Sequence, residues 1–248
     1  MQVIILAGGK GTRMGSITEK LPKPMVRLGN KPMIVRIMEH YSLYGFNNFL
    51  ILTGYKQDII KDYFSNLPLN NCDVEIDYSS KKVNFLNNKY SSWKVKIINT
   101  GLETNTGMRL LKASKHIEDD YFHLTYGDGL SDINLEKLIE NHKANKKLLT
   151  ITAVHPPTKF GELIFKDDKV ISFEEKPKLS EGFINGGFMV SDKRLLKYIK
   201  GDVMLERTPM KNICAEGQMN CFIHKGYWKC FDTAKDVKNY SSLQEEEL

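Results

Sequence analysis

The stretch that decides the fold runs Val3-Ile4-Ile5-Leu6-Ala7-Gly8-Gly9-Lys10-Gly11-Thr12-Arg13-Met14. Its first four residues are consecutive apolar residues, as in a fully buried strand, and the glycines that follow predict a tight turn. Such a turn can present bare backbone N–H groups to an anion, and Arg13 adds a fixed cation. Lys23, in the sequence L-P-K-P-M, follows within reach. The stretch therefore predicts a strand that ends in a loop for nucleotide phosphates.

The glycine spacing differs from both common nucleotide-binding patterns. It lacks the G-x-x-x-x-G-K-[S/T] order of a P-loop and the G-x-G-x-x-G order of a dinucleotide fold. Three glycines after a strand are also compatible with an ordinary surface turn. The specific feature is the combination of L-A-G-G-x-G-T-R with a lysine ten residues after the arginine, in K-P-M.

The composition favours a globular protein of the cytoplasm. The chain has 248 residues, of which 41% are hydrophobic, and this is enough for a substantial core. No apolar run approaches the ~18 residues needed to cross a bilayer, so we expect no membrane partner. The four cysteines form no C-x-x-C pair, so we expect ordinary reduced thiols and no zinc.

The net charge of +6 is carried by lysines spread along the chain, which are 30 of its 36 basic residues. A scattered lysine surface is typical of solvation, so we expect no nucleic-acid partner. Two of the six arginines, Arg13 and Arg109, lie beside glycine turns. Because arginine presents a planar fork to phosphate that lysine cannot imitate, their positions favour an anion site.

The order of periodic segments predicts an α/β fold with a mostly parallel sheet. Helical spacing over residues 33–43 is followed by a buried strand at 49–53 and a second helix through Phe64. This cadence predicts right-handed crossovers. Further strands are predicted at 95–98, 121–125 and 148–154, and further helices at 105–117 and 134–144. A hairpin over 161–173 begins a half of mixed strands.

A polar segment over residues 79–92 interrupts this pattern. It follows the alternating strand Val74, Ile76 and Tyr78, and it is rich in Asn and Lys. We interpret it as a long exposed loop or hairpin. Such a segment is uncommon in a compact domain unless it binds something or joins an assembly.

Two aspartates follow strands and are candidate metal ligands. Asp128, in the Y-G-D-G motif, comes at the carboxyl end of the strand 121–125, where open α/β sheets bind ligands. A carboxylate beside a triphosphate would hold Mg²⁺, although an ordinary Asp-Gly turn is the alternative. Asp232 is the second candidate. It could equally be an acid that favours the start of the last helix, where Thr233 and Asp236 predict a capping box.

Two further groups of residues are candidates for binding substrates. The helix start at Thr106-Gly107, with Arg109, could hold an anion or a polar base edge, or could be only a helix start. Lys176, in F-E-E-K-P, and Asn185, in I-N-G-G-F, could hold a monophosphate and a hydroxyl-bearing substituent. For the E-K-P sequence alone, a surface turn is the alternative.

Six motifs, in order along nearly the whole chain, resemble the signature of the sugar-1-phosphate nucleotidyltransferases. They are L-A-G-G-K-G-T-R, L-P-K-P-M, Y-G-D-G, F-E-E-K-P, I-N-G-G-F and W-x-x-x-D-T. Three features, T-G-x-R at 106–109, Y-G-D-G and I-N-G-G-F, resemble in particular the bacterial glucose-1-phosphate cytidylyltransferases. The resemblance implies a single domain, 1–248, with a Rossmann-like, mixed and mostly parallel sheet flanked by helices. Residues 1–155 would form its nucleotide-binding half and residues 156–248 its sugar-phosphate-binding half.

The same resemblance implies which residues meet each substrate. CTP would contact Leu6, Ala7, Gly8, Gly9, Gly11, Thr12, Arg13, Lys23, Thr106, Gly107, Arg109, Gly127 and Asp128. A sugar 1-phosphate would contact Tyr126, Glu175, Lys176, Asn185 and Gly186. Asp128 and Asp232 would share Mg²⁺. Arg13, Lys23 and Asp128 would be catalytic, and the protein would be a homo-oligomer.

The expected reaction is in-line attack of a sugar 1-phosphate on the α-phosphorus of CTP, with release of pyrophosphate. A phosphate monoester is already an anion, so alignment and charge neutralisation matter more than a base. The alternatives are the same chemistry with UTP, dTTP or another phosphomonoester, a glycosyltransferase that uses a nucleotide sugar, and a regulatory subunit that binds nucleotide without turnover.

Overall fold

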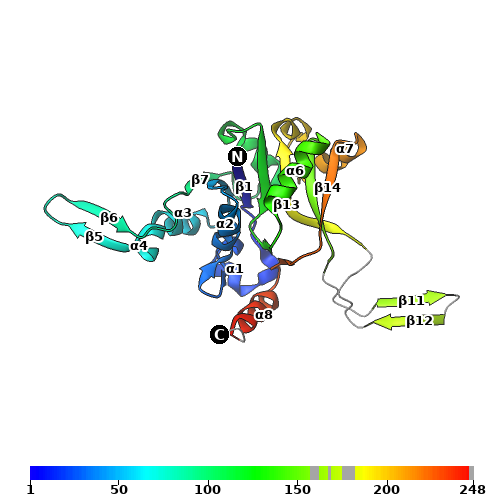
Figure 1. Ribbon diagram of the computed structural model, residues 1–248, viewed down its shortest axis with the longest axis horizontal. Coiled ribbons are helices and arrows are strands. Elements are labelled where there is room, and N and C mark those ends of the chain that lie inside the picture. Colours follow the sequence, from blue (N-terminus) through cyan, green and yellow to red (C-terminus); the bar gives the residue numbers. More distant parts are fainter. Residues whose placement is uncertain (157–161, 167–168, 175–181, 246–248) are drawn as a thin grey trace.

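A seven-stranded sheet in the order β14-β10-β13-β8-β1-β4-β7 forms the centre of the protein (Figure 1). The structure is a computed structural model that describes residues 1–156, 162–166, 169–174 and 182–245. The strands of the sheet are β1 (Gln2–Ala7), β4 (Asn48–Thr53), β7 (Lys94–Asn99), β8 (Tyr121–Tyr126), β10 (Leu149–Val154), β13 (Ile184–Asp192) and β14 (Met219–His224).

The directions of the strands confirm the predicted mixed, mostly parallel sheet. The pairs β1·β4, β1·β8, β4·β7 and β10·β14 are parallel. Strand β13 lies between β8 and β10 and is antiparallel to both. Residues from the early and late parts of the chain therefore share one sheet.

The sheet is buried on both faces, and after Gln2 its central strand β1 is apolar at every position. In β1 all six residues are buried. Val3, Ile5 and Ala7 pack into one hydrophobic cluster, while Ile4 and Leu6 pack into another on the opposite face. This is the continuous apolar run that a parallel strand needs when helices cover both of its faces.

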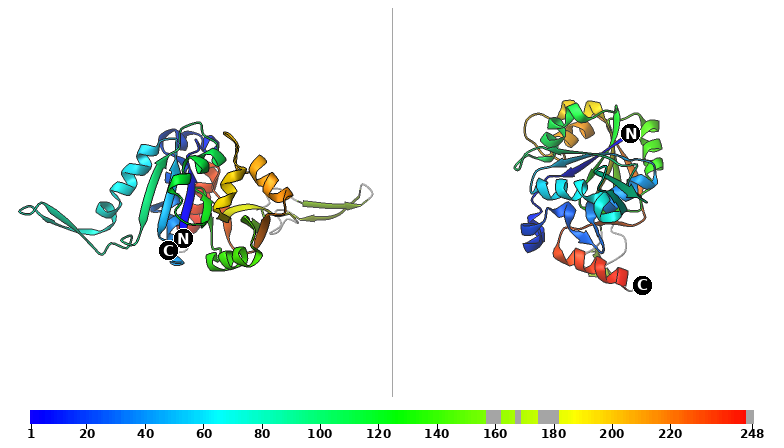
Figure 2. Two further views of the ribbon diagram at one scale, coloured as in Figure 1. Left: turned by 90° about the horizontal axis from the view of Figure 1, so that it is seen from above. Right: turned by 90° about the vertical axis from the view of Figure 1, so that its left-hand side faces the viewer.

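Helices cover each face of the sheet (Figure 2). The cluster that includes Ile5 is completed by α2 (Met33–Leu43), α3 (Gln57–Ser65) and α6 (Leu135–Asn145). The cluster that includes Ile4 is completed by α5 (Thr106–Lys112), α7 (Thr208–Ala215) and the 3₁₀ helix η4 (Lys193–Tyr198). The remaining helices are α1 (Ser16–Lys20), α4 (Leu67–Asn71), α8 (Ala234–Glu245), η1 (Thr12–Met14), η2 (Lys23–Met25) and η3 (Ser114–His116).

One predicted helix is shorter than expected. The pattern predicted a helix over 105–117, but α5 ends at Lys112. Ala113 has a ψ of 0°, outside the helical range, and the next three residues tighten into η3. The apolar residue Ile117 still reaches the core, because it follows this tighter turn rather than a continued α-helix. The spacing of apolar residues predicted the burial of Ile117, but it did not predict the change from α-helix to 3₁₀ helix before it.

Two hairpins extend away from the sheet at opposite ends of the molecule (Figure 1). One consists of β5 (Asp73–Asp77) and β6 (Lys82–Leu86), and it confirms that the polar segment after residue 78 is an exposed hairpin. The other consists of β11 (Glu162–Lys166) and β12 (Lys169–Glu174), as predicted. The remaining strands of the described chain are the pair β9 (Gly129–Ser131) with β15 (Trp228–Cys230) and the pair β2 (Arg27–Leu28) with β3 (Lys31–Pro32).

Candidate active site

Two aspartates from distant parts of the chain meet beyond the carboxyl end of β8. Asp128 follows β8, and Asp232 follows β15. Strand β15 pairs antiparallel with β9, with Cys230 opposite Gly129. The backbone N–H of Phe231 donates to the carbonyl oxygen of Asp128 at 2.9 Å. This pairing brings the two carboxylates, together with the Cys230 thiol, within 4.8 Å of one another.

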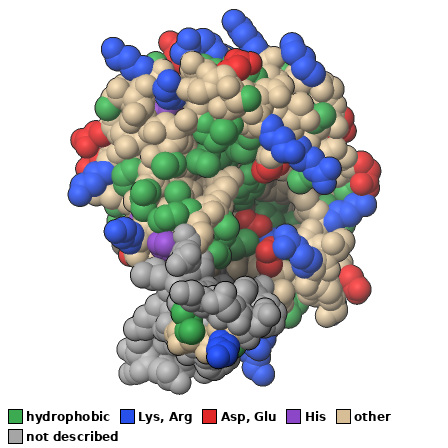
Figure 3. All heavy atoms as spheres, turned by 90° about the vertical axis from the view of Figure 1, so that its right-hand side faces the viewer, with side chains coloured by type: hydrophobic (Ala, Val, Ile, Leu, Met, Phe, Trp, Pro, Cys, Tyr) green, Lys and Arg blue, Asp and Glu red, His purple; other side chains and the backbone are tan. Residues whose placement is uncertain are grey.

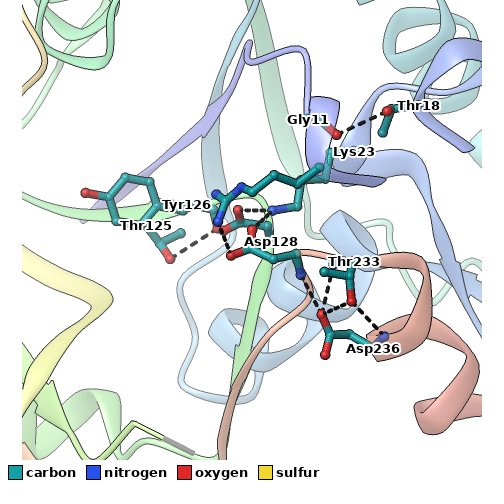
Figure 4. Close-up of polar contacts among 10 residues, drawn as sticks. Gly11, Thr18, Lys23, Thr125, Tyr126, Asp128, Thr233 and Asp236 are labelled. Atoms are coloured by element: carbon teal, nitrogen blue, oxygen red, sulfur yellow. Dashed lines mark hydrogen bonds and ion pairs between the residues drawn. The ribbon is translucent and has the colours of Figure 1, made fainter. Parts of the chain in front are cut away.

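Lys23 lies between the two carboxylates (Figure 4). Its Nζ is 2.6 Å from Asp128 Oδ2 and 2.6 Å from Asp232 Oδ1. Burial disfavours the charge on this side chain, which is 10% exposed, but the interactions with the Asp128 and Asp232 carboxylates together outweigh burial and raise the pKa of Lys23. Arg13 Nη1 lies 2.6 Å from the other oxygen of Asp232. The acid pair is therefore matched by two cations.

The sequence around Lys23 fixes its backbone. Prolines on both sides hold it in the short 3₁₀ helix η2, because proline fixes φ. Gly11 lies against it with a φ of +64°, and a Cβ built on Gly11 would lie 2.9 Å from the Cβ of Lys23. Glycine at position 11 is thus required both by its backbone conformation and by this close approach.

The start of α8 holds Asp232 in place. The predicted capping box is confirmed: Asp236 N–H donates to Thr233 Oγ1 at 3.3 Å, and Thr233 N–H donates to Asp236 Oδ2 at 2.8 Å (Figure 4). Asp236 Oδ2 also accepts the backbone N–H of Asp232 at 3.2 Å. Because Asp236 serves the helix start, the carboxylate of Asp232 faces Lys23 and Arg13 instead.

A cavity of about 290 Å³ opens beside the first loop, next to the acid pair. Most of the residues predicted to meet the nucleotide line it. Its lining is Leu6, Ala7, Gly8, Gly9, Lys23, Pro24, Thr104, Asn105, Thr106, Arg109, Tyr126, Gly127, Asp128 and Met204. Four of the predicted nucleotide residues, namely Gly11, Thr12, Arg13 and Gly107, lie outside this lining.

Arg109 forms the floor of this cavity rather than its rim. Its side chain is 3% exposed, and burial lowers its pKa. The two terminal nitrogens have five oxygen acceptors, namely the carbonyls of Gly8, Thr53, Gly101 and Leu102 and the hydroxyl of Thr100. Arg109 therefore ties the loops that follow β1 and β7 to the end of strand β4. The sequence placed it at the site but did not show these acceptors.

A second cavity of about 390 Å³ lies on the other side of the acids. Its lining is Arg13, Thr125, Tyr126, Asp128, Gly129, Asn185, Gly186, Gly187, Phe188, Glu206, Trp228, Cys230 and Asp232. Tyr126 and Asp128 line both cavities. On the side of the molecule that carries β11–β12, the surface is hollowed, with acidic side chains inside the hollow and basic ones beside them (Figure 3).

The residues predicted for the sugar phosphate are only partly described. Tyr126, Asn185 and Gly186 line the second cavity. Glu175 and Lys176 lie outside the described residues. The indole N–H of Trp228 donates to the carbonyl oxygen of Gly186 at 2.7 Å, which fixes the start of β13 at the cavity wall.

Comparison with known proteins decides the family. The family model described as Nucleotidyl transferase matches residues 2–245. The chain belongs to the nucleotidyl transferase family. Two relatives are each 38% identical to this nucleotidyl transferase, and the chain covers 96% of both. They are the "Probable glucose-1-phosphate cytidylyltransferase" of Bacillus subtilis, matched over 98% of this chain, and the glucose-1-phosphate cytidylyltransferase of Salmonella typhimurium, matched over 99%.

A solved structure shares the fold of this nucleotidyl transferase. The structure of HddC from Yersinia pseudotuberculosis, complexed with GMP-PN, matches with a TM-score of 0.69 and 25% identity. The match covers 98% of this chain and 99% of that protein. Likeness over nearly the full length agrees with the central sheet described above.

The acid pair of this nucleotidyl transferase fits a divalent metal, which enzymes of the family generally use. Asp128 and Asp232 supply hard oxygen ligands of the kind that such ions prefer. Burial raises the pKa of the neighbouring Cys230 thiol to about 12, so this group stays protonated near neutral pH. The thiol is therefore a neighbour of the carboxylates rather than a third anionic ligand.

Among the described residues, no helix is both long and apolar enough to cross a membrane. All four cysteines are free thiols.

Proposed function

We propose that the protein transfers CMP from CTP to α-D-glucose 1-phosphate, giving CDP-glucose and pyrophosphate, with Mg²⁺ as the divalent metal. The observation that carries this proposal is the acid pair, matched by Lys23 and Arg13, at the boundary of two cavities. One cavity adjoins the glycine loop and the other adjoins Asn185. The names of the cytidylyltransferase relatives support the choice of nucleotide and acceptor.

The nucleotide is assigned to the cavity beside the first loop. There the backbone of Gly8 and Gly9 leaves room for a base and ribose, and Arg109 holds the carbonyl of Gly8 from below at 3.0 Å. The triphosphate extends toward the acids, where Lys23 and Arg13 are the nearest described cations. Gly11, Thr12 and Gly107 complete the assigned set by shaping the backbone around this path.

The sugar 1-phosphate is assigned to the second cavity. Tyr126 and Asn185 present polar groups to it, and Gly186 leaves space beside them. Glu175 and Lys176, assigned from the motif F-E-E-K-P, would face the sugar and its phosphate respectively. For in-line attack the acceptor would approach the α-phosphorus from the side opposite the leaving pyrophosphate.

The chemistry requires charge neutralisation and alignment more than a base. The attacking phosphate oxygen already carries charge at neutral pH, so the protein must overcome repulsion between two anions. Lys23, raised in pKa, stays protonated and is placed to neutralise charge that develops on the α-phosphate. Arg13 offers a fork to the other phosphates. Asp128 and Asp232 would hold Mg²⁺, which would supply positive charge beside the reacting phosphates.

A substrate panel scored by pyrophosphate release tests this function. The panel combines CTP, UTP, dTTP and GTP with glucose 1-phosphate and other phosphomonoesters. We expect the highest kcat/KM for CTP with glucose 1-phosphate, and loss of release when a chelator removes the divalent metal. Higher release with another pair would favour the same chemistry on different substrates. Tight CTP binding without release would favour a regulatory subunit, and sugar transfer without pyrophosphate would favour a glycosyltransferase.

The hairpin of β5 and β6, here called the β5–β6 arm, supports the proposal that the protein is a homo-oligomer. Its register places Val74 opposite Phe85 and Ile76 opposite Val83, so one face is apolar. These four side chains are 39–47% exposed. A two-stranded hairpin is only marginally stable alone, and an exposed apolar face marks an interaction site.

A second copy of this chain is the proposed partner of the β5–β6 arm. The opposite face carries the acids Asp73, Glu75 and Asp77 on a protein whose net charge is +6, so another copy offers a complementary surface. We expect light scattering to give a multiple of 28.5 kDa, and Phe85→Glu to lower that mass. Asn84→Glu, on the polar face, is the matched control. A monomeric wild type, or an unchanged mass for Phe85→Glu, would contradict the assignment.

We further propose that residues 1–248 act as one domain in the cytoplasm. Strands from both halves of the chain share the central sheet, which supports a single folding unit. Free thiols are typical of a reducing compartment, which supports the location.

A further inference from the structure

Glu206 is a carboxylate in the second cavity to which the motifs assign no role. It lies in the segment between η4 and α7 and is half-buried. It lines the same cavity as Asn185 and Gly186. In the sequence it is surrounded by no glycine turn and follows no strand, so no pattern singled it out.

Both oxygens of Glu206 are held by side chains that are distant in the sequence. Tyr126 Oη donates to Oε1 at 2.5 Å, and Thr106 Oγ1 donates to Oε2 at 2.7 Å. Thr106 Oγ1 in turn accepts the backbone N–H of Leu205 at 2.9 Å. The orientation of the Glu206 carboxylate is therefore fixed from both sides.

These bonds leave the carboxylate able to accept more. Each carboxylate oxygen has two lone pairs, and here each has one donor among the described residues. A cavity that contains a fixed carboxylate with spare acceptor capacity recognises hydroxyl or amine donors. It also disfavours an anion at that point, so a phosphate would lie toward the other end of the cavity, where Arg13 pairs with Asp232.

We propose that Glu206 is the residue that recognises a ring hydroxyl of the acceptor sugar and so orients the sugar phosphate for attack. This inference rests on the proposed function, and it assigns the hydroxyl end of the acceptor to the Tyr126 side of the second cavity. Tyr126 and Thr106 act as positioning residues that hold the carboxylate. Sites built to hydrogen-bond a hydroxyl discriminate strongly against an analogue that lacks it, because a buried polar group is then left unpaired.

The test pairs a conservative variant with a series of deoxy substrates. Glu206→Gln keeps the shape of the side chain but removes the charge and half of its acceptor capacity. The kcat/KM of CMP transfer is measured for glucose 1-phosphate and for its 2-, 3-, 4- and 6-deoxy analogues. For the wild type we expect a loss of at least about tenfold with at least one analogue. In Glu206→Gln we expect that particular loss to shrink to about twofold or less, while losses with the other analogues persist.

A matched control separates recognition from general stability. Glu216 also accepts a hydrogen bond from a tyrosine, Tyr198, but it is exposed and lines neither cavity. Glu216→Gln should keep the wild-type pattern with all four analogues. If Glu206→Gln does not fold, Tyr126→Phe removes one of the bonds that orient the same carboxylate and should weaken the same discrimination.

Two outcomes overturn the inference in distinguishable ways. If the wild type works on glucose 1-phosphate but Glu206→Gln keeps its full discrimination against every analogue, Glu206 reads no hydroxyl and only this inference fails. If the wild type releases no pyrophosphate from CTP and glucose 1-phosphate, the proposed function fails, and the assignment of Glu206 falls with it.

Discussion

Replacing Lys23 by Met tests two proposed roles of this lysine, namely competition with a divalent ion for the carboxylates and neutralisation of charge on the α-phosphate. In the structure its ammonium group is 2.6 Å from a carboxylate oxygen on both Asp128 and Asp232. A divalent ion that binds the same acids must compete with this charge. During turnover the same ammonium is proposed to neutralise charge on the α-phosphate. Met keeps most of the side-chain volume and removes the charge.

The size of both effects follows from the geometry. A unit charge about 4 Å from another contributes about 4 kcal/mol at an effective dielectric constant of about 20. The two carboxylates are 27% and 26% exposed, so water screens part of this interaction. We therefore expect Mn²⁺ to bind Lys23→Met at least about tenfold more tightly without nucleotide, which corresponds to about 1.4 kcal/mol. Turnover should fall by about 10²–10³-fold, as for the loss of one charge-stabilising contact.

Mn²⁺ binding is measured by the loss of the free-ion signal in electron paramagnetic resonance, and turnover by pyrophosphate release. Lys10→Met is the control, because Lys10 makes its ion pair with the exposed Glu103. Its replacement changes the net charge of the protein by the same amount as Lys23→Met. Equal Mn²⁺ affinities for wild type, Lys10→Met and Lys23→Met would refute the competition. Near-normal turnover of Lys23→Met would refute the catalytic role.

Three further predictions concern stability and the cavity walls. Arg109→Leu leaves the carbonyl oxygens of Gly101 and Leu102 without their donor, so we expect about 3 kcal/mol of destabilisation and a Tm lower by about 6–12 °C in calorimetry. Burial lowers the pKa of His123 to about 3 from 6.5, so unfolding is favoured as pH falls below 6.5. His123→Phe should remove about 2 kcal/mol of the stability lost between pH 7 and pH 5 in urea titrations; an unchanged loss would contradict this. In Gly187→Ala the new Cβ would lie 2.6 Å from the Tyr126 ring at a φ of +83°, so KM for the acceptor should rise more than KM for CTP in steady-state kinetics.

Much of the fold was predictable because it depends on local patterns. The apolar run of β1 could be satisfied only by burial on both faces, and its glycine end required a turn at the carboxyl edge. Asp128 was placed by the same logic, since it follows a parallel strand. The capping pattern at Thr233 located the start of α8 and, with it, the position of Asp232.

The rest depends on partners that no local pattern specifies. Arg109 bonds to carbonyl oxygens from two loops and from the end of β4, and any residue type can supply a carbonyl. Glu206 and Tyr126 are 80 residues apart in the sequence, and no sequence motif links the two positions. Alternation predicted the strand at Val74 but did not show that its apolar face packs against no other part of the described chain.

Because β13 runs antiparallel to β8, changes in acceptor preference can evolve separately from changes in nucleotide preference. Because β13 is antiparallel to β8, its first residues, which include Asn185, arrive at the edge where the neighbouring strand finishes. The chain that leads into it is distinct from the turn that follows β1. Mutations that lengthen or rebuild that incoming chain can therefore exchange one acceptor for another while the nucleotide loop is inherited unchanged. In chimeras that exchange only residues 155–186 between relatives, we expect the acceptor preference to follow the source of that segment. The preference for the nucleotide base should stay that of the rest of the chain.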